Sequence, residues 1–370
     1  MAALIGAGLA DARARLADGR GHEVPARILD LHHVWDFFRA RLLPRRVRDL
    51  RRVLDVADEL AWQCYGPVLA LPGVRPKEPP LVAFSRTASP RAHRRGSAYQ
   101  DLLPRGGIHT RQGREAAARL PFPVIEVPWY FGGHLPALLG VAHESAHHIE
   151  DDCGLGAEIH HRVTTAGLPP DRTAHWSRWA GEAFADVCAS VVCRTAYAEL
   201  LTDLLDSELP VDEQDFDGPH PPPAARVRLA RAAASREPAE TGEEAVVAAA
   251  LLDGGYEGLG GRTLTELLTA PDDGDVPAGA ERLLRGLPSG CRSAGAVLSA
   301  AAIAFQTDPE GYDTHGVGER AVDEVLRLRG TGTRTATVRA HPHDHADAGA
   351  LLLAALDAVP ERGPSRPVSP

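Results

Sequence analysis

The stretch LLGVAHESAHHIED (138–151) is the most informative part of the sequence, because an apolar helical segment there carries the pattern HESAH (143–147). Residues four apart lie on one face of a helix, so the imidazoles of His143 and His147 can hold one Zn²⁺. Glu144, beside the first histidine, can reach a water bound to that ion. The stretch therefore predicts a zinc-binding helix.

The flanking sequence gives this helix limits and neighbours. Pro136 can occupy its first turn, and Gly154 is a natural C-terminal stop. Residues 123–127 (PVIEV), β-branched and bounded by prolines, form the strongest strand candidate and precede the helix directly. After Gly154 we expect a loop over 155–174 and then a second long helix over 175–205.

A third protein ligand is needed, because a catalytic zinc site has three such ligands and a position for water. The second predicted helix contains EAFAD (182–186), in which Glu182 and Asp186 share one face. Glu182 would complete a His₂Glu site. Asp186, one turn further on, could accept the other ring N–H of a ligand histidine, which fixes the tautomer of that histidine.

HESAH (143–147) and EAFAD (182–186) together resemble the signature of the gluzincins, the thermolysin-like zinc metallopeptidases, with HExxH on one helix and ExxxD on the next. The resemblance implies that His143, His147 and Glu182 are zinc ligands, that Glu144 is the general base and that Asp186 supports a ligand histidine. It implies hydrolysis of peptide bonds in a peptide or protein substrate, and it covers only the two helices and the segment between them.

A second resemblance concerns His220-Pro221 followed by Arg226, which looks like the HP-x₄-R element of the CAAX prenyl proteases and HtpX-type peptidases. In those families the element stabilises the oxyanion of the tetrahedral intermediate, so the resemblance assigns His220 and Arg226 to catalysis. The alternative is a histidine that occurs by chance in a proline-rich surface loop. Those families span membranes, and no membrane span is expected here, so lipidated substrates are not implied.

The fold class we expect is α+β and mostly helical, with few aromatic residues and a core of Ala, Leu and Val. A small sheet, including 123–127 and a second strand at 81–84, should pack on the active-site helix of a zincin-like domain, with one strand edge beside the cleft. The expected divisions are an N-terminal helical region, the zincin-like domain, a C-terminal helical region and a disordered tail, at 1–78, 79–210, 211–359 and 360–370. The helical apolar pattern over 31–56 should break into two helices at Pro44. The C-terminal helices are expected at 225–235, 243–252, 264–268, 280–284, 294–305, 319–328 and 348–356.

Composition excludes several classes of protein. The net charge of −10 argues against a nucleic-acid binder, which would show a strongly basic domain. The five cysteines are few and unevenly spaced, as in a reducing compartment. The N-terminus has no basic region of a secretory signal, and the longest apolar stretch, 294–305, is too short to cross a bilayer. We therefore expect a soluble, cytoplasmic protein without membrane or nucleic-acid partners; Lys77, the only lysine, indicates a GC-rich bacterial genome.

Several features remain open at this stage. The metal site could serve binding or a scaffold instead of proteolysis, or hydrolyse a small amide. His341, His343 and His345 could form a second metal site or simply precede a C-terminal helix. The acidic end of the active helix, 150–152, is expected to be solvated; the alternatives are that it meets an arginine or restricts basic substrates. Trp176, Trp179, Cys188 and Cys193 are expected in the core. The substrate, the choice between endo- and exopeptidase action and the oligomeric state have no signal in the sequence.

Overall fold

The computed structural model describes residues 2–72, 79–94, 123–206, 218, 220–235, 242–270 and 273–329. The chain divides into two compact units. One unit comprises Met1–Pro44, Arg95–Pro121 and Thr333–Pro370, and the other comprises Arg45–Arg94 and Phe122–Gly332. The expected tail, the helix at 348–356 and the histidines at 341, 343 and 345 lie outside the described residues.

The described part of the first unit is a pair of helices, α1 (Ala2–Ala17) and α2 (Val24–Leu42), which pack against each other. A short 3₁₀ turn, η1 (Gly21–Glu23), separates them. Helix α2 ends before Pro44, and α3 (Arg48–Leu69) begins after it, in the second unit. The break predicted at this proline is therefore confirmed.

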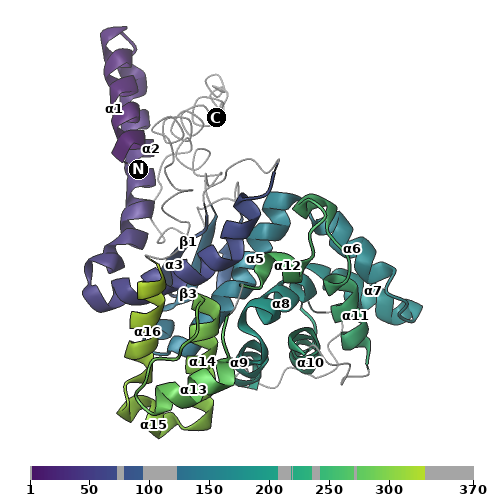
Figure 1. Cartoon of the computed structure of the whole chain (residues 1–370). Coiled ribbons are helices and arrows are strands. Elements are labelled where there is room, and N and C mark those ends of the chain that lie inside the picture. Colours follow the sequence, from purple (N-terminus) through teal and green to yellow (C-terminus); the bar gives the residue numbers. More distant parts are fainter. Residues whose placement is uncertain are drawn as a thin grey trace, which may run out of the picture. The chain divides into compact units, whose positions relative to one another are not determined.

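A small sheet lies in the second unit (Figure 1). Strand β3 (Val124–Pro128) is fully buried at its centre, β1 (Leu81–Ser85) pairs with it in parallel, and β2 (Arg91–His93) pairs with it in antiparallel fashion. The two strands expected from the sequence are confirmed. Strand β2 was not predicted, since three residues within an arginine-rich stretch carry no alternation of apolar residues. Among the strands of the described residues, β2 lies at one edge of the sheet and β1 at the other.

Helices make up most of the second unit, so the coarse class, mostly helical with a small sheet, is confirmed. After β3 come η4 (Trp129–Gly132), η5 (Leu135–Leu139), α5 (Gly140–Cys153), α6 (Gly156–Thr164), α7 (Pro170–Arg178), α8 (Ala180–Cys193) and α9 (Thr195–Asp206). The later elements are α10 (Pro223–Ala234), α11 (Glu243–Leu252), η6 (Glu257–Leu259), α12 (Leu264–Leu268), α13 (Val276–Leu284), α14 (Ala294–Thr307), α15 (Pro309–Thr314) and α16 (Val317–Leu328). The unit therefore combines α3 and α10–α16 with the segment expected to form the catalytic domain.

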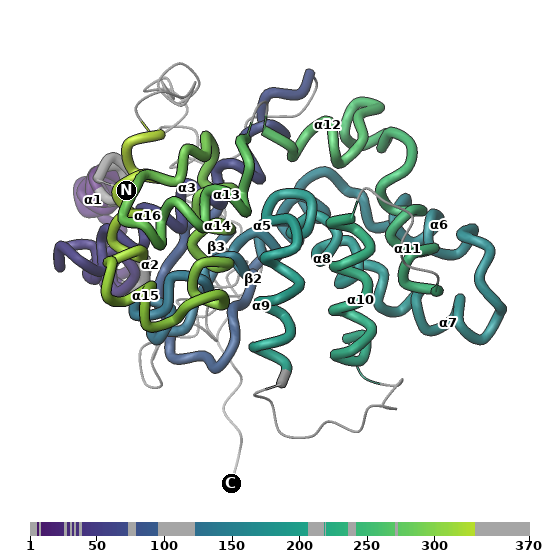
Figure 2. The backbone as a smooth tube through the Cα atoms, turned by 60° about the horizontal axis from the view of Figure 1, so that its bottom comes forward, coloured from purple at the N-terminus to yellow at the C-terminus, as the bar shows by residue number. Residues whose placement is uncertain are grey.

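Two helices, α5 and α8, pack directly against each other, with α3 on α5 and α10 on α8. Figure 2 shows α9 and α10 side by side next to α8, in agreement with the packing of α10 against both. Helix α5 ends at Gly154, which takes the left-handed conformation (φ 66°, ψ 34°), while the amide of Leu155 donates to the carbonyl of Glu150 at 2.9 Å. The predicted stop of this helix is confirmed. Its start is not where it was expected, because Pro136 lies in the 3₁₀ helix η5 and α5 begins only at Gly140.

The segment after Gly154 differs from the prediction. A loop over 155–174 was expected, but α6 and most of α7 lie there. The single helix expected over 175–205 is interrupted twice, at Trp179 and at Arg194. Arg194 has φ 56° and ψ −146°, a backbone conformation that glycine normally occupies. The sequence has neither glycine nor proline there, so nothing local signals the break.

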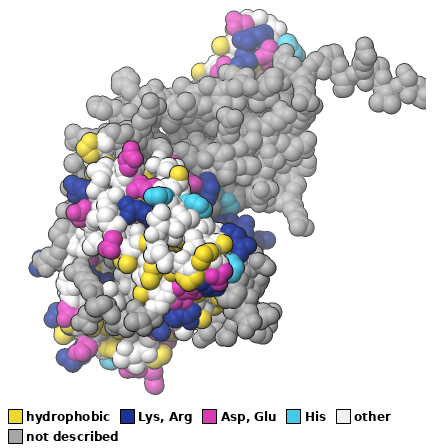
Figure 3. All heavy atoms as spheres, turned by 90° about the vertical axis from the view of Figure 1, so that its right-hand side faces the viewer, with side chains coloured by type: hydrophobic (Ala, Val, Ile, Leu, Met, Phe, Trp, Pro, Cys, Tyr) yellow, Lys and Arg dark blue, Asp and Glu magenta, His cyan; other side chains and the backbone are white. Residues whose placement is uncertain are grey.

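The core agrees with the expectation from composition. Trp176 and Trp179 are fully buried and stack edge to face at 5.7 Å between ring centroids. Cys188 and Cys193 are buried, and all five cysteines are free thiols. Among the described residues, no helix combines the length and the apolar character that crossing a membrane requires. Figure 3 shows basic and acidic side chains interspersed over the described part of the face formed by α6, α7 and α11.

Candidate metal centre

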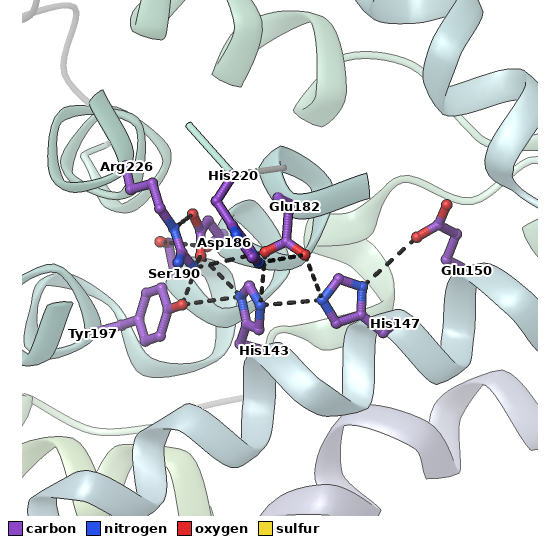
Figure 4. A network of polar contacts seen from close by, with 9 residues as sticks. All are labelled: His143, His147, Glu150, Glu182, Asp186, Ser190, Tyr197, His220 and Arg226. Atoms are coloured by element: carbon purple, nitrogen blue, oxygen red, sulfur yellow. Dashed lines mark hydrogen bonds and ion pairs between the residues drawn. The ribbon is translucent and has the colours of Figure 1, made fainter. Parts of the chain in front are cut away.

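Three side chains that can ligate a metal converge where α5 packs against α8 (Figure 4). His143 and His147 lie one turn apart on α5, and Glu182 lies in the first turn of α8. The Nε2 atoms of the two histidines are 3.1 Å apart. The carboxylate oxygens of Glu182 lie 3.4 Å from the first Nε2 and 3.5 Å from the second. The three predicted ligands thus form a cluster that can hold a metal ion.

The spacing of the donor atoms agrees with the ion that the resemblance implies. A tetrahedral Zn²⁺ with ligands at about 2.0–2.1 Å would hold those ligands about 3.3–3.4 Å from one another. The two imidazole nitrogens are 3.1 Å apart, and each has a different oxygen of Glu182 at 3.4 or 3.5 Å, so the separations lie around that value. Two imidazoles and one carboxylate are also an established donor set for zinc that leaves a fourth position open. The residues present therefore fit such an ion.

The second ring nitrogen of His143 faces a fully buried carboxylate. Its Nδ1 lies 2.8 Å from Oδ1 of Asp186, and the hydroxyl of Tyr197 donates to the same oxygen at 2.7 Å. When Nδ1–H donates to Asp186, the Nε2 lone pair points to the cluster. Burial alone would lower the pKa of His143, but hydrogen bonds and charge interactions with Asp186 and Glu182 raise it to about 10. A metal ion must displace this proton.

Arg226, on α10, binds the same carboxylate. Its Nε and Nη2 donate to the two oxygens of Asp186 at 2.8 and 2.7 Å, and its side chain is only 13% exposed. Burial opposes ionisation of Asp186, but Arg226 and His143 hold the pKa of this carboxyl well below its usual range. The nearest oxygen of Glu182 is 4.0 Å from Arg226. Burial would also raise the pKa of Glu182, which His143, His147 and Arg226 lower to about 2.

His220 lies at the rim of the cluster. Its Nε2 is 3.7 Å from Oε1 of Glu182, and its side chain is 56% exposed. The buried indole of Trp179 donates from Nε1 to the carbonyl oxygen of Gly218 at 3.0 Å, which fixes the chain two residues before His220. The structure therefore separates the two members of the HP-x₄-R element. His220 faces the open side of the cluster, whereas Arg226 is buried against Asp186.

A cavity of about 780 Å³ opens beside the three ligands, a size typical of ligand sites. Glu144 lines it together with the ligand side chains, and so does His220. Strand β2 and the residues before it, from Ala88 to Ala92, form one wall. Helix α9 forms an apolar wall with four leucines, Leu200, Leu201, Leu204 and Leu205. The expectation that a strand edge flanks the cleft agrees with the place of β2.

Sequence reasoning missed two residues of this network. Tyr197 contacts both Asp186 and His143, but it follows the unpredicted break at Arg194, so no periodic pattern connects it to the site. Glu150 was assigned to a solvated acidic cluster, yet its side chain is only 14% exposed and faces His147. Its position three residues after a ligand, on the same helix face, was the available signal.

The chain matches no protein-family model, and it matches none of the curated proteins or solved structures with which it was compared. The case for a function therefore depends on the chemistry of the cluster and of the cavity beside it.

Proposed function

We propose that the protein is a zinc-dependent metallopeptidase that hydrolyses peptide bonds. The observation that carries the proposal is the convergence of His143, His147 and Glu182 at separations of 3.1–3.5 Å, on a cavity that Glu144 also lines. Hydrolysis by an activated water needs ligands for the metal and a separate carboxylate that can take a proton. The two histidines and Glu182 can supply the ligands, and Glu144 can supply the separate carboxylate.

One of the three ligands, His143, has a buried carboxylate as its outer partner. His143, His147 and Glu182 would hold the ion, and Asp186 orients His143 through its Nδ1 at 2.8 Å. When bound, Zn²⁺ supplies a Lewis acid that lowers the pKa of a coordinated water. Arg226 keeps Asp186 ionised in the interior, where an isolated carboxylate would otherwise be protonated.

Two further residues act on the substrate. Glu144 takes a proton from the attacking water and later gives a proton to the leaving amine, which is general base and then general acid catalysis. His220, exposed at the cavity rim 3.7 Å from Glu182, donates a hydrogen bond to the oxyanion that develops on the attacked carbonyl. The substitutions Glu144→Gln and His220→Ala separate these two roles from metal binding, because neither residue is a ligand.

The cavity walls suit an extended peptide. Strand β2, an edge strand among the described residues, can offer backbone groups for main-chain hydrogen bonds, which hold a peptide without demanding a particular sequence. The leucines of α9 on the cavity wall favour a substrate with an apolar side chain near the cleaved bond. A peptide segment without stable structure therefore fits the site best.

The test is cleavage of fluorescently labelled casein, an unstructured protein, by the zinc-loaded full chain. We expect cleavage by the wild type, cleavage reduced about 10²–10⁴-fold in Glu144→Gln, and equal zinc content in both. Zinc bound by the wild type without cleavage of casein or of short apolar peptides would contradict the peptidase proposal. It would favour a binding role, or a small amide as substrate.

A further inference from the structure

A second carboxylate lies behind the metal cluster, on the side of His147 opposite to Glu182 (Figure 4). Oε2 of Glu150 is 3.9 Å from Nδ1 of His147, and the Glu150 side chain is 14% exposed. This oxygen is buried and has no hydrogen-bond partner among the described residues. An ionised carboxylate in that position is costly unless a donor satisfies it.

Two glycines leave the space that this carboxylate occupies. A Cβ atom on Gly181 would lie 3.1 Å from Oε2 and 3.4 Å from Oε1 of Glu150. A Cβ atom on Gly156 would lie 3.5 Å from Oε1. Gly181 directly precedes the ligand Glu182, and Gly156 begins α6. The carboxylate is thus held in a slot between the starts of α6 and α8, with His147 in front of it.

The two ligand histidines differ in their outer partners. Nδ1 of His143 lies 2.8 Å from Asp186, whereas the carboxylate nearest to Nδ1 of His147 is Glu150. Metal-ligating histidines usually donate their second N–H to an acceptor, which fixes the tautomer and strengthens the ligand. We infer that Glu150 is the positioning residue for His147 and accepts its Nδ1–H when the metal is bound. This inference rests on the proposed metal site.

The step from the present geometry is small. A hydrogen bond of ordinary length needs Oε2 of Glu150 to approach Nδ1 of His147 by about 1 Å, which a side-chain torsion provides. The unsatisfied oxygen then gains a donor, and the imidazole gains a fixed orientation. Glu150 therefore stabilises the metal-loaded state and not the metal-free one.

This difference between the two states separates a positioning role from a merely structural one. Zinc affinity is measured by competition with a chelator for the wild type, Glu150→Ala, Glu150→Gln and the matched control Asp151→Asn. Asp151 carries the same charge one position further on and pairs with Arg94 at 2.9 Å. Thermal unfolding of each metal-free variant is measured alongside.

We expect Glu150→Ala to bind zinc about 10–100-fold more weakly, with a metal-free melting temperature equal to or above that of the wild type. Glu150→Gln, which keeps an acceptor oxygen, should recover part of the affinity, and Asp151→Asn should stay within about threefold of the wild type. An unchanged affinity in Glu150→Ala, or an equal loss in Asp151→Asn, would overturn the inference while the metal site stands. A wild type that binds no zinc would overturn both.

Discussion

Replacement of Arg226 by alanine is expected to lower the free energy of unfolding by about 3–5 kcal/mol, because it removes one partner of a buried ion pair. Asp186 is fully buried, and two of its strongest hydrogen bonds, at 2.7 and 2.8 Å, come from Arg226. Among the described residues, Tyr197 and His143 would remain as partners of this carboxylate. A loss of this size should lower the melting temperature by roughly 6–20 °C.

The matched control is Arg231→Ala on the same helix. Arg231 pairs with Glu199 at 3.2 Å, but the two side chains are 45% and 41% exposed, so its removal should cost less than about 1 kcal/mol. Both variants are compared by urea unfolding of the metal-free chain. Asp186→Asn combined with Arg226→Ala should recover part of the loss, since the double variant leaves no charge unpaired.

The outcome distinguishes two roles for Arg226. If Arg226 only stabilised an oxyanion, its replacement would slow turnover and leave the free energy of unfolding unchanged. If Arg226 instead supports Asp186, its removal should lower the free energy of unfolding and the metal affinity together. A cost below about 1 kcal/mol, equal to that of Arg231→Ala, would show that the pair with Asp186 contributes little and would refute this reasoning.

Three further predictions concern the site. Glu144→Gln should keep its zinc and lose about 10²–10⁴-fold in casein cleavage, and a variant that stays active would exclude Glu144 as the base. The pKa of His143 is about 10 in the metal-free folded chain and about 6.5 in the unfolded chain. Protonation of His143 therefore stabilises the folded chain fully at pH values below 6.5, and this stabilisation is lost as the pH rises towards 10. Zinc must displace this proton, so its apparent affinity should rise roughly tenfold per pH unit between about pH 7 and 9, as calorimetry in buffers of different ionisation enthalpy would detect; a flat profile would contradict it. Trp179→Phe removes the hydrogen-bond donor to the Gly218 carbonyl and should lower turnover with metal content unchanged. Turnover equal to that of the wild type would show that this hydrogen bond does not position His220 for catalysis.

The parts of the fold that the sequence predicted are those that depend on local chemistry. Helices α11 and α12 have the expected bounds, because periodic apolar residues mark them. The break between α8 and α9 was missed because it depends on the positive φ of Arg194, a backbone conformation that an arginine in the sequence does not signal. Strand β2 was missed because it is short and is defined by its pairing with β3.

The same distinction holds for the site. The spacing of His143 and His147 on one helix face is local, so the sequence was sufficient to bring them together. The contacts of Tyr197 depend on how α9 packs beside α5 and α8, which no spacing rule reports, whereas the position of Glu150 three residues after His147 on α5 was a local signal. Arg226 was recognised from a motif, but its pairing with Asp186 emerged only from the packing of α10 on α8.

The most direct test of the central claim is the zinc content of the purified full chain after dialysis, measured by elemental analysis beside Glu182→Ala. We expect about one zinc per wild-type chain and loss of most of it in the variant. A wild type that takes up no zinc when it is added, or a Glu182→Ala variant that retains all of it, would contradict the assignment of His143, His147 and Glu182 as the metal site.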